Sequence, residues 1–246
     1  VDTRRGVGVA EPAQLQLKLG SQELRLLLTA ADFLHTTVGA IGLSSLAALL
    51  YRHTQQSALS IEVLEMMRDG AQPEPPASAL EFALSDDSTL QALLEQARCQ
   101  PEGGQVQRTS NVAFVVAADA DVRTLTELEP WASGRYELVA GVHQTPHELT
   151  LSLTYDARLF RAERARAWLE QYALLVSQLA ASPGTCVLQP ALLTATARTL
   201  LPDPSQAIAL PSHAPLAVTF RACAERTPHQ IAVTQAGASF TYAELA

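Results

Sequence analysis

The chain has little of what several common functions require. Its 17 lysine and arginine residues are outnumbered by 25 aspartate and glutamate residues, which gives a formal net charge of −8. Nucleic acids and anionic membranes both need a basic surface on the protein that binds them. We therefore expect no nucleic acid and no membrane among the partners of this chain.

Long apolar runs and paired cysteines are also missing. No apolar run is long enough to span a bilayer, and the first residues, VDTRRGVGVAEP, lack the apolar core of a signal peptide. The three cysteines, Cys99, Cys186 and Cys223, are odd in number and far apart, and they do not have the spacing of a metal site. These features predict a cytoplasmic, reducing location.

Residue patterns typical of a catalytic or cofactor site are absent as well. No glycine-rich segment ends in Gly-Lys-Ser/Thr, so the sequence has no phosphate-binding loop of that kind. His143 and His147 are four residues apart, but Pro146 lies between them, and two ligands are too few for a closed zinc site. We predict no catalytic residue, no metal and no cofactor in this chain.

The segment from Glu148 to Pro183 has the clearest pattern of secondary structure. Leucines at 149, 151 and 153 and Tyr155 alternate with threonine and serine, which predicts a strand with one dry face. Apolar residues then recur at helical spacing through Trp168, Tyr172 and Leu179, and Ser182-Pro183-Gly184 ends the helix. Arg161, Arg164 and Arg166 are expected on its solvated face.

Further elements are expected on both sides of this segment. Residues 38–51 are apolar or small at nearly every position, which predicts a buried helix, and Gly39 and Gly42 would let another backbone approach it closely. Ser21 is predicted to cap a helix over 24–32, and Ser88 with Gln91 to form a capping box before a helix over 89–99. The remaining periodic segments predict strands at 15–19, 59–63, 80–85, 112–117 and 136–142.

Several of these segments together resemble the condensation domain of nonribosomal peptide synthetases. The strand and helix after Glu148 carry the family's Leu-x-Leu-x-Tyr and Leu-Phe residues at 151, 153, 155, 159 and 160. The segment around the helix at 38–51 matches at Thr36 or Thr37, Leu49, Leu50, Arg52, Gln55 or Gln56, and Arg68. The resemblance implies an α/β fold: a single chloramphenicol-acetyltransferase-like lobe, with a mixed β-sheet packed by α-helices.

The chain departs from this family in one decisive respect. Condensation domains act through a His-His-x-x-x-Asp-Gly motif in their N-terminal lobe, and this sequence has no such motif. The resemblance therefore implies a truncated domain, reduced to its C-terminal lobe at residues 13–185 after a tail at 1–12. Arg108, Ser110 and Asn111 match the family near a buried strand. Two interpretations stay open for them: they satisfy backbone groups, or they line a remnant of the tunnel.

The last part of the chain resembles the beginning of an adenylation domain. Residues 186–215 contain five prolines, which predicts an interdomain linker. Residues 216–246 then match the adenylation start at Phe220, Pro228, Thr241, Tyr242, Glu244 and Leu245. We expect a short helix that ends before Pro228, a hairpin that turns at Ala236-Gly237, and a capping box from Thr241 to Glu244.

The resemblance implies a structural function within a larger enzyme. The leading hypothesis is a non-catalytic platform for an adenylation domain in the same polypeptide, in an initiation module of peptide antibiotic or other natural-product biosynthesis. The parent enzyme would use ATP, magnesium and phosphopantetheine on a carrier domain. Two alternatives stay open: the C-terminal lobe of a split condensation domain that a separate N-terminal lobe completes, or a docking module for a carrier protein or an upstream synthetase.

Overall fold

The computed structural model describes residues 11–65, 78–99, 110–118, 136–202, 205 and 215–246. Arg68 and Arg108 lie outside these ranges. The chain divides into two compact units, Val1–Leu200 and Leu201–Ala246. Each unit is described separately below.

The first unit is built on a six-stranded mixed sheet with the order β1-β6-β5-β4-β2-β3. Strand β4 runs parallel to β2 and β5, and the other neighbouring pairs are antiparallel. The strands are β1 (Pro12–Leu19), β2 (Ala58–Glu65), β3 (Ser78–Ala83), β4 (Val112–Ala118), β5 (Leu138–Gln144) and β6 (Leu149–Asp156). All six strands expected from the sequence are therefore present.

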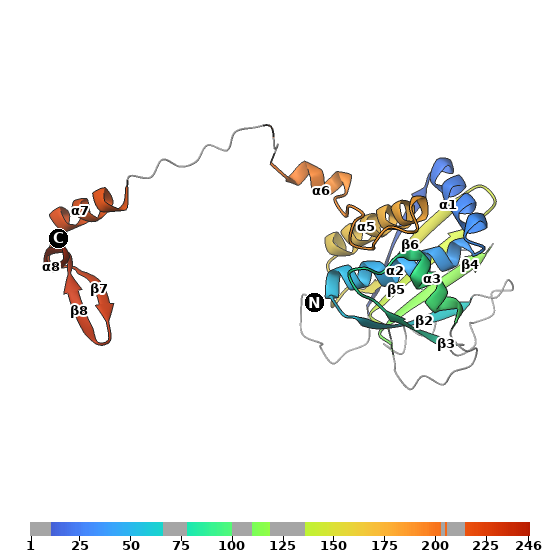
Figure 1. The fold of residues 1–246 in the computed structure, drawn as a ribbon, viewed down its shortest axis with the longest axis horizontal. Helices are drawn as coiled ribbons and strands as arrows, with labels where there is room; N and C mark the ends of the chain where they lie inside the picture. Colours follow the sequence, from blue (N-terminus) through green and yellow to red (C-terminus); the bar gives the residue numbers. More distant parts are fainter. Residues whose placement is uncertain (1–10, 66–77, 100–109, 119–135, 203–204, 206–214) are drawn as a thin grey trace. The chain divides into compact units, whose positions relative to one another are not determined.

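Four helices pack on one face of this sheet (Figure 1). They are α1 (Ser21–Phe33), α2 (Val38–Thr54), α3 (Leu90–Arg98) and α5 (Ala162–Ala181). Their apolar sides form one contiguous core with alternate residues of the strands, such as Ile61, Phe114 and Leu151, none of which is exposed. This is the predicted α/β lobe with a mixed sheet covered by helices.

Helix α2 lies in the middle of the core, and its two glycines explain how closely it can approach the sheet. A Cβ atom on Gly42 would lie 2.6 Å from Cγ2 of Val142 and 3.0 Å from the hydroxyl of Tyr172. A Cβ atom on Gly39 would lie 3.0 Å from Val116. The contacts are close, but the neighbours are side chains of β4, β5 and α5 and not the backbone that was predicted to approach.

Strand β6 is buried on both faces, so the predicted single dry face is wrong. Thr150, Ser152 and Thr154 are at most 3% exposed. Alternation of leucine with threonine or serine marks two chemically different faces, but it does not show whether water reaches the more polar one. Threonine and serine can be buried when their hydroxyls find partners, as that of Thr150 does on the carboxylate of Glu148 at 3.2 Å.

Two predicted helix caps are displaced by one residue. Gly20, not Ser21, is the residue before α1. Thr89, not Ser88, caps α3, because its hydroxyl accepts the backbone N–H of Ala92 at 3.2 Å. Each of these short segments offers two adjacent candidates for the cap, and the backbone path selects one of them.

Residues 186–200, named the strap here, pack against the first unit. Val187 is fully buried, and its N–H donates to the carbonyl of Ser88 at 2.8 Å. The guanidinium of Arg52 on α2 donates to the carbonyl of Val187 at 3.2 Å and to that of Pro190 at 2.5 Å. Helix α6 (Ala195–Leu200) ends the strap. The first half of the predicted linker, residues 186–200, is therefore fixed to the lobe.

The second unit contains α7 (Leu216–Arg226), β7 (Ile231–Gln235), β8 (Ala238–Thr241) and α8 (Tyr242–Leu245). Ala236 and Gly237 both have positive φ, at 49° and 86°, which is the backbone of a tight hairpin turn. The backbone N–H of Thr241 donates to the carboxylate of Glu244 at 2.7 Å in a capping box. The predicted hairpin and capping box are confirmed.

Within the described ranges, no single helix is both long and apolar enough to cross a membrane. Helices α1 and α2 reach that length and composition only as a pair, and the chain bends by 98° between them.

Candidate functional site

Of the three residues that could line a remnant of the tunnel, the structure describes Ser110 and Asn111. Arg108 lies outside the described residues. Ser110 is buried before β4, and its hydroxyl contacts the carbonyls of Ser60 at 2.5 Å and Val112 at 2.8 Å and the N–H of Val112 at 3.1 Å. These bonds agree with the first interpretation, in which the side chain of Ser110 satisfies backbone groups. Asn111 is exposed and donates to Glu137 at 3.3 Å.

The structure adds a buried carboxylate that sequence reasoning missed. Glu62 on β2 is 2% exposed, accepts a hydrogen bond from the buried hydroxyl of Tyr136, and lies 3.4 Å from the backbone N–H of Ser110. A glutamate between Ile61 and Val63 is the usual pattern for a solvent-facing strand position, so no local signal distinguishes it. The carboxylate therefore has hydrogen-bond partners in the interior, as buried polar groups require.

An apolar cavity of about 310 Å³ lies in the first unit between α2, α5 and strands β4, β5 and β6. Its walls include Leu46 and Leu49 from α2, Leu138 and Leu153 from the strands, and Phe160 before α5. Tyr172 also lines the cavity. Its hydroxyl donates to the carbonyl of Gly42 at 2.9 Å, and burial raises the pKa of this phenol. The cavity is therefore mainly a hydrocarbon environment.

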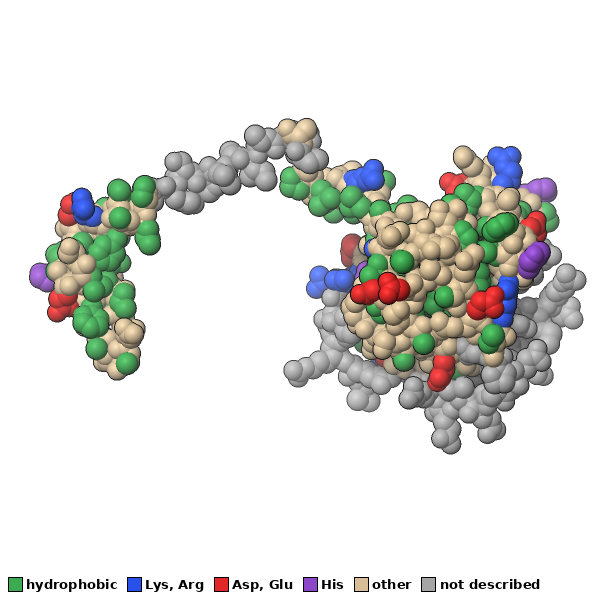
Figure 2. Space-filling view, in the orientation of Figure 1, with side chains coloured by type: hydrophobic (Ala, Val, Ile, Leu, Met, Phe, Trp, Pro, Cys, Tyr) green, Lys and Arg blue, Asp and Glu red, His purple; other side chains and the backbone are tan. Residues whose placement is uncertain are grey.

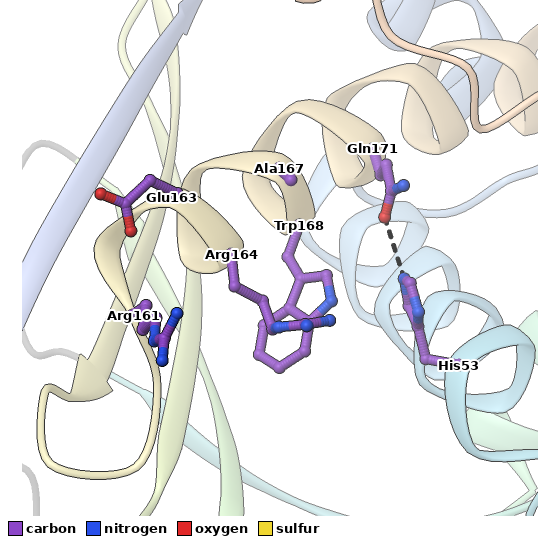
Figure 3. A pocket seen from close by; sticks show the side chains of 7 residues that line it. All are labelled: His53, Arg161, Glu163, Arg164, Ala167, Trp168 and Gln171. Carbon is purple, nitrogen blue, oxygen red and sulfur yellow. Dashed lines mark hydrogen bonds between the residues drawn. The ribbon is translucent and has the colours of Figure 1, made fainter. Parts of the chain in front are cut away.

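The outer side of this cavity is polar (Figure 3). An open depression of about 510 Å³ shares His53, Arg164 and Trp168 with the cavity and adds Arg161, Glu163, Ala167 and Gln171. The imidazole of His53 bonds to the amide oxygen of Gln171 at 2.9 Å, which fixes one edge. Trp168 stands between the two spaces, and its ring packs edge-on against Phe160 with centroids 5.1 Å apart.

Trp168 was predicted from its helical spacing to be a core residue. It is only partly buried, and it lines both the cavity and the depression. Arg161, Arg164 and Arg166 are all exposed, as expected of a solvated helix face. The structure adds that the first two line the depression, because α5 begins there.

The histidines are scattered among the described residues. His143 lies within β5, and His147 lies in the turn that follows. In the ranges that the structure describes, no three histidine, cysteine, aspartate or glutamate residues gather as metal ligands would.

The residues that match an adenylation start lie together in the second unit. The rings of Phe220 and Tyr242 are 5.4 Å apart, and the N–H of Ala243 donates to the carbonyl of Pro228 at 2.9 Å. Large apolar side chains remain accessible around them: Leu216 is 85% exposed and Ile231 59%. Figure 2 shows hydrophobic side chains over much of this unit. None of its described residues is buried.

Comparison with known proteins identifies the fold. No known protein family and no curated protein matches the sequence. Among solved structures, the chain is similar to the four-domain nonribosomal peptide synthetase AB3403, with a TM-score of 0.61 at 14% identity over 96% of this chain and 22% of that one. It is similar to the X-domain from teicoplanin biosynthesis, seen in a complex with OxyB, with a TM-score of 0.59 at 15% identity over 77% of this chain and 50% of the other.

A third similar structure is the first condensation domain of the CDA synthetase, with a TM-score of 0.56 at 18% identity over 77% of this chain and 49% of that domain. The chain thus spans about half the length of the condensation domain and the X-domain that it matches. It has the fold of one condensation-domain lobe, which is a chloramphenicol-acetyltransferase-like lobe.

Proposed function

We propose that the first unit is a non-catalytic platform in a nonribosomal peptide synthetase, and that residues 216–246 begin the adenylation domain it supports. Two features support this: the fold of a condensation-domain lobe, and the adenylation-start residues that follow in the same chain. The match to the four-domain synthetase covers 96% of the chain, compared with 77% for the CDA condensation domain.

The observation that carries the proposal is the exposed apolar surface of the second unit. Its helix and hairpin bear side chains such as Leu216, Val218, Ile231 and Val233, which are 47% to 85% exposed. About 30 residues cannot bury a core of their own, so these side chains need further protein around them. Continuation into an adenylation domain would supply that cover.

Side-chain hydrogen bonds hold the strap on the lobe. Two hydrogen bonds join the amide of Gln178 on α5 to the backbone of Ala191, and the hydroxyl of Thr196 donates to Glu170 at 3.1 Å. With the bonds from Arg52, these contacts hold the strap on the lobe. The chain would then leave the platform from a defined position, and the platform would cover apolar surface of its partner that otherwise invites aggregation.

The test is deletion of residues 1–185 from the full synthetase. We expect the soluble yield to fall strongly, while amino-acid-dependent pyrophosphate exchange per mole of soluble enzyme stays within about twofold, a change of less than 0.5 kcal/mol in barrier. A loss of exchange in soluble enzyme as large as the loss of yield would contradict the proposal.

The alternative of a split condensation domain has one observation in its favour: the chain spans 49% of the CDA condensation domain that it matches. A separate polypeptide with the missing motif would then supply the other lobe. Peptide-bond formation by the two polypeptides mixed, and by neither alone, would establish this alternative in place of the platform.

A further inference from the structure

The cavity behind Trp168 is too large to be ordinary packing space. Protein interiors contain few voids larger than a water molecule. An apolar cavity of about 150 Å³ is enough to hold benzene. By that comparison, the cavity of about 310 Å³ has room for roughly a dozen non-hydrogen atoms.

The lining decides which part of a ligand can enter. Leu46, Leu49, Leu138 and Leu153 offer only hydrocarbon. The hydroxyls of the lining residues are used within the protein: that of Tyr172 donates to a backbone carbonyl at 2.9 Å, and that of Thr54 donates to the carbonyl of Leu50 at 2.8 Å. His53, Glu137 and Arg164 also line the cavity. A polar group placed inside would lose its water without gaining these partners. The cavity therefore suits an apolar tail.

The depression outside Trp168 has a different chemistry. Arg161 and Arg164 both line it, one helical turn apart at the start of α5. Glu163 also lines it, but Figure 3 shows its carboxylate pointing away from Trp168. A second acid, Glu137, lines the cavity but not the depression. Arg164 lines both spaces, whereas Arg161 lines the depression alone, so an anionic group is favoured at the outer end.

We propose that this site binds a small apolar carboxylic acid, with its hydrocarbon tail in the cavity and its carboxylate at Arg161 and Arg164. A guanidinium matches a carboxylate in geometry and charge. The tail would pass the indole of Trp168, which separates the two spaces. The site lies wholly within the first unit, so this proposal is independent of the platform function.

The test compares octanoate with octanamide, which have the same number of non-hydrogen atoms and differ in charge. Titration calorimetry on the 246-residue chain should show saturable binding of octanoate, and binding of octanamide at least tenfold weaker. The double substitution Arg161→Gln and Arg164→Gln should weaken octanoate binding about tenfold, or 1.4 kcal/mol, and leave octanamide unchanged. Arg166→Gln is the matched control, because Arg166 is exposed on the same helix and lines neither space.

A second variant tests the cavity itself. Leu50→Trp should fill it, because Leu50 lines the cavity and is only partly buried, and binding of both compounds should be lost. A melting curve by circular dichroism checks that the variant folds, and the arginine variants decide the question if it does not. The proposal is overturned by absence of saturable binding, by equal affinity for the acid and the amide, or by equal weakening in the Arg166→Gln control.

Discussion

Replacement of Gly42 by alanine tests how the core of the lobe is packed. The added Cβ atom would lie 2.6 Å from Cγ2 of Val142, 3.0 Å from the hydroxyl of Tyr172 and 3.2 Å from Cζ of Phe114. All three neighbours are buried at 3% exposure or less, so little space is available for them to move. Overpacking of this kind costs about 1 to 3 kcal/mol.

Two further effects of Gly42→Ala oppose each other. Displacement of Tyr172 would weaken its hydrogen bond to the carbonyl of Gly42, worth about 1 kcal/mol, whereas alanine is better than glycine in a helix by about 1 kcal/mol. The free energy of unfolding should therefore fall by about 1 to 3 kcal/mol in total. Urea denaturation followed by circular dichroism measures this change.

Two other glycines provide a graded comparison for the same assay. A Cβ atom on Gly39 would lie 3.0 Å from Val116, and one on Gly184 would meet only the amide oxygen of Gln91, at 3.9 Å. The loss of stability should decrease from Gly42→Ala to Gly39→Ala and should be absent in Gly184→Ala. If Gly42→Ala were as stable as the wild-type chain, helix propensity would outweigh the contact, and the packing argument would be refuted.

Two more substitutions test polar contacts of the lobe. Arg52→Met removes the bonds to the strap, 186–200, and should lower the free energy of unfolding by about 1.5 to 3 kcal/mol and speed amide hydrogen exchange in the strap. The control Arg166→Met, on an exposed helix face, should change neither quantity. Unchanged exchange in the strap of Arg52→Met would contradict the role of Arg52 in holding it. The guanidinium of Arg158 lowers the pKa of the buried Asp156. The ionised carboxylate therefore stabilises the fold above its unfolded pKa, about 3.9. That stability is lost as the pH falls through the lower pKa of the folded state. Asp156→Asn should therefore destabilise at pH 7 by about 1 to 3 kcal/mol, with a difference from the wild-type chain that shrinks below about pH 4; a difference independent of pH would refute this.

Local patterns predicted the elements because each element has its own signal. The alternation at 149–155 and the helical spacing from Trp168 to Leu179 both correspond to observed elements. The Thr241–Glu244 capping box could be predicted because both of its residues lie within one turn. The glycines of α2 were informative for a physical reason: they cost helix propensity, so their presence indicated a close contact.

Contacts between distant residues could not be predicted in the same way. Tyr136 and Glu62 are 74 positions apart, and neither stands out in its own segment. The strap was predicted as part of a linker because the whole range 186–215 contains five prolines, although only Pro190 lies in the strap itself. The fully buried Val187 and the bonds from Arg52 fix it to the lobe. The cavity is lined by residues of α2, α5 and strands β4, β5 and β6, which are far apart in the sequence, so no single stretch encodes it.

The way the core closes bears on the choice between platform and split enzyme. One contiguous apolar cluster extends from Leu24 to Val187 and joins all four packed helices to the sheet. A lobe that buries its own apolar residues in this way does not require a second lobe in order to fold. The first unit also exposes a few large apolar side chains, such as Phe33 and Leu200. The second unit differs because none of its described residues is buried, and Leu216 and Ile231 are 85% and 59% exposed. The need for further protein is therefore greatest around residues 216–246, which supports the proposal of a platform rather than that of a split enzyme.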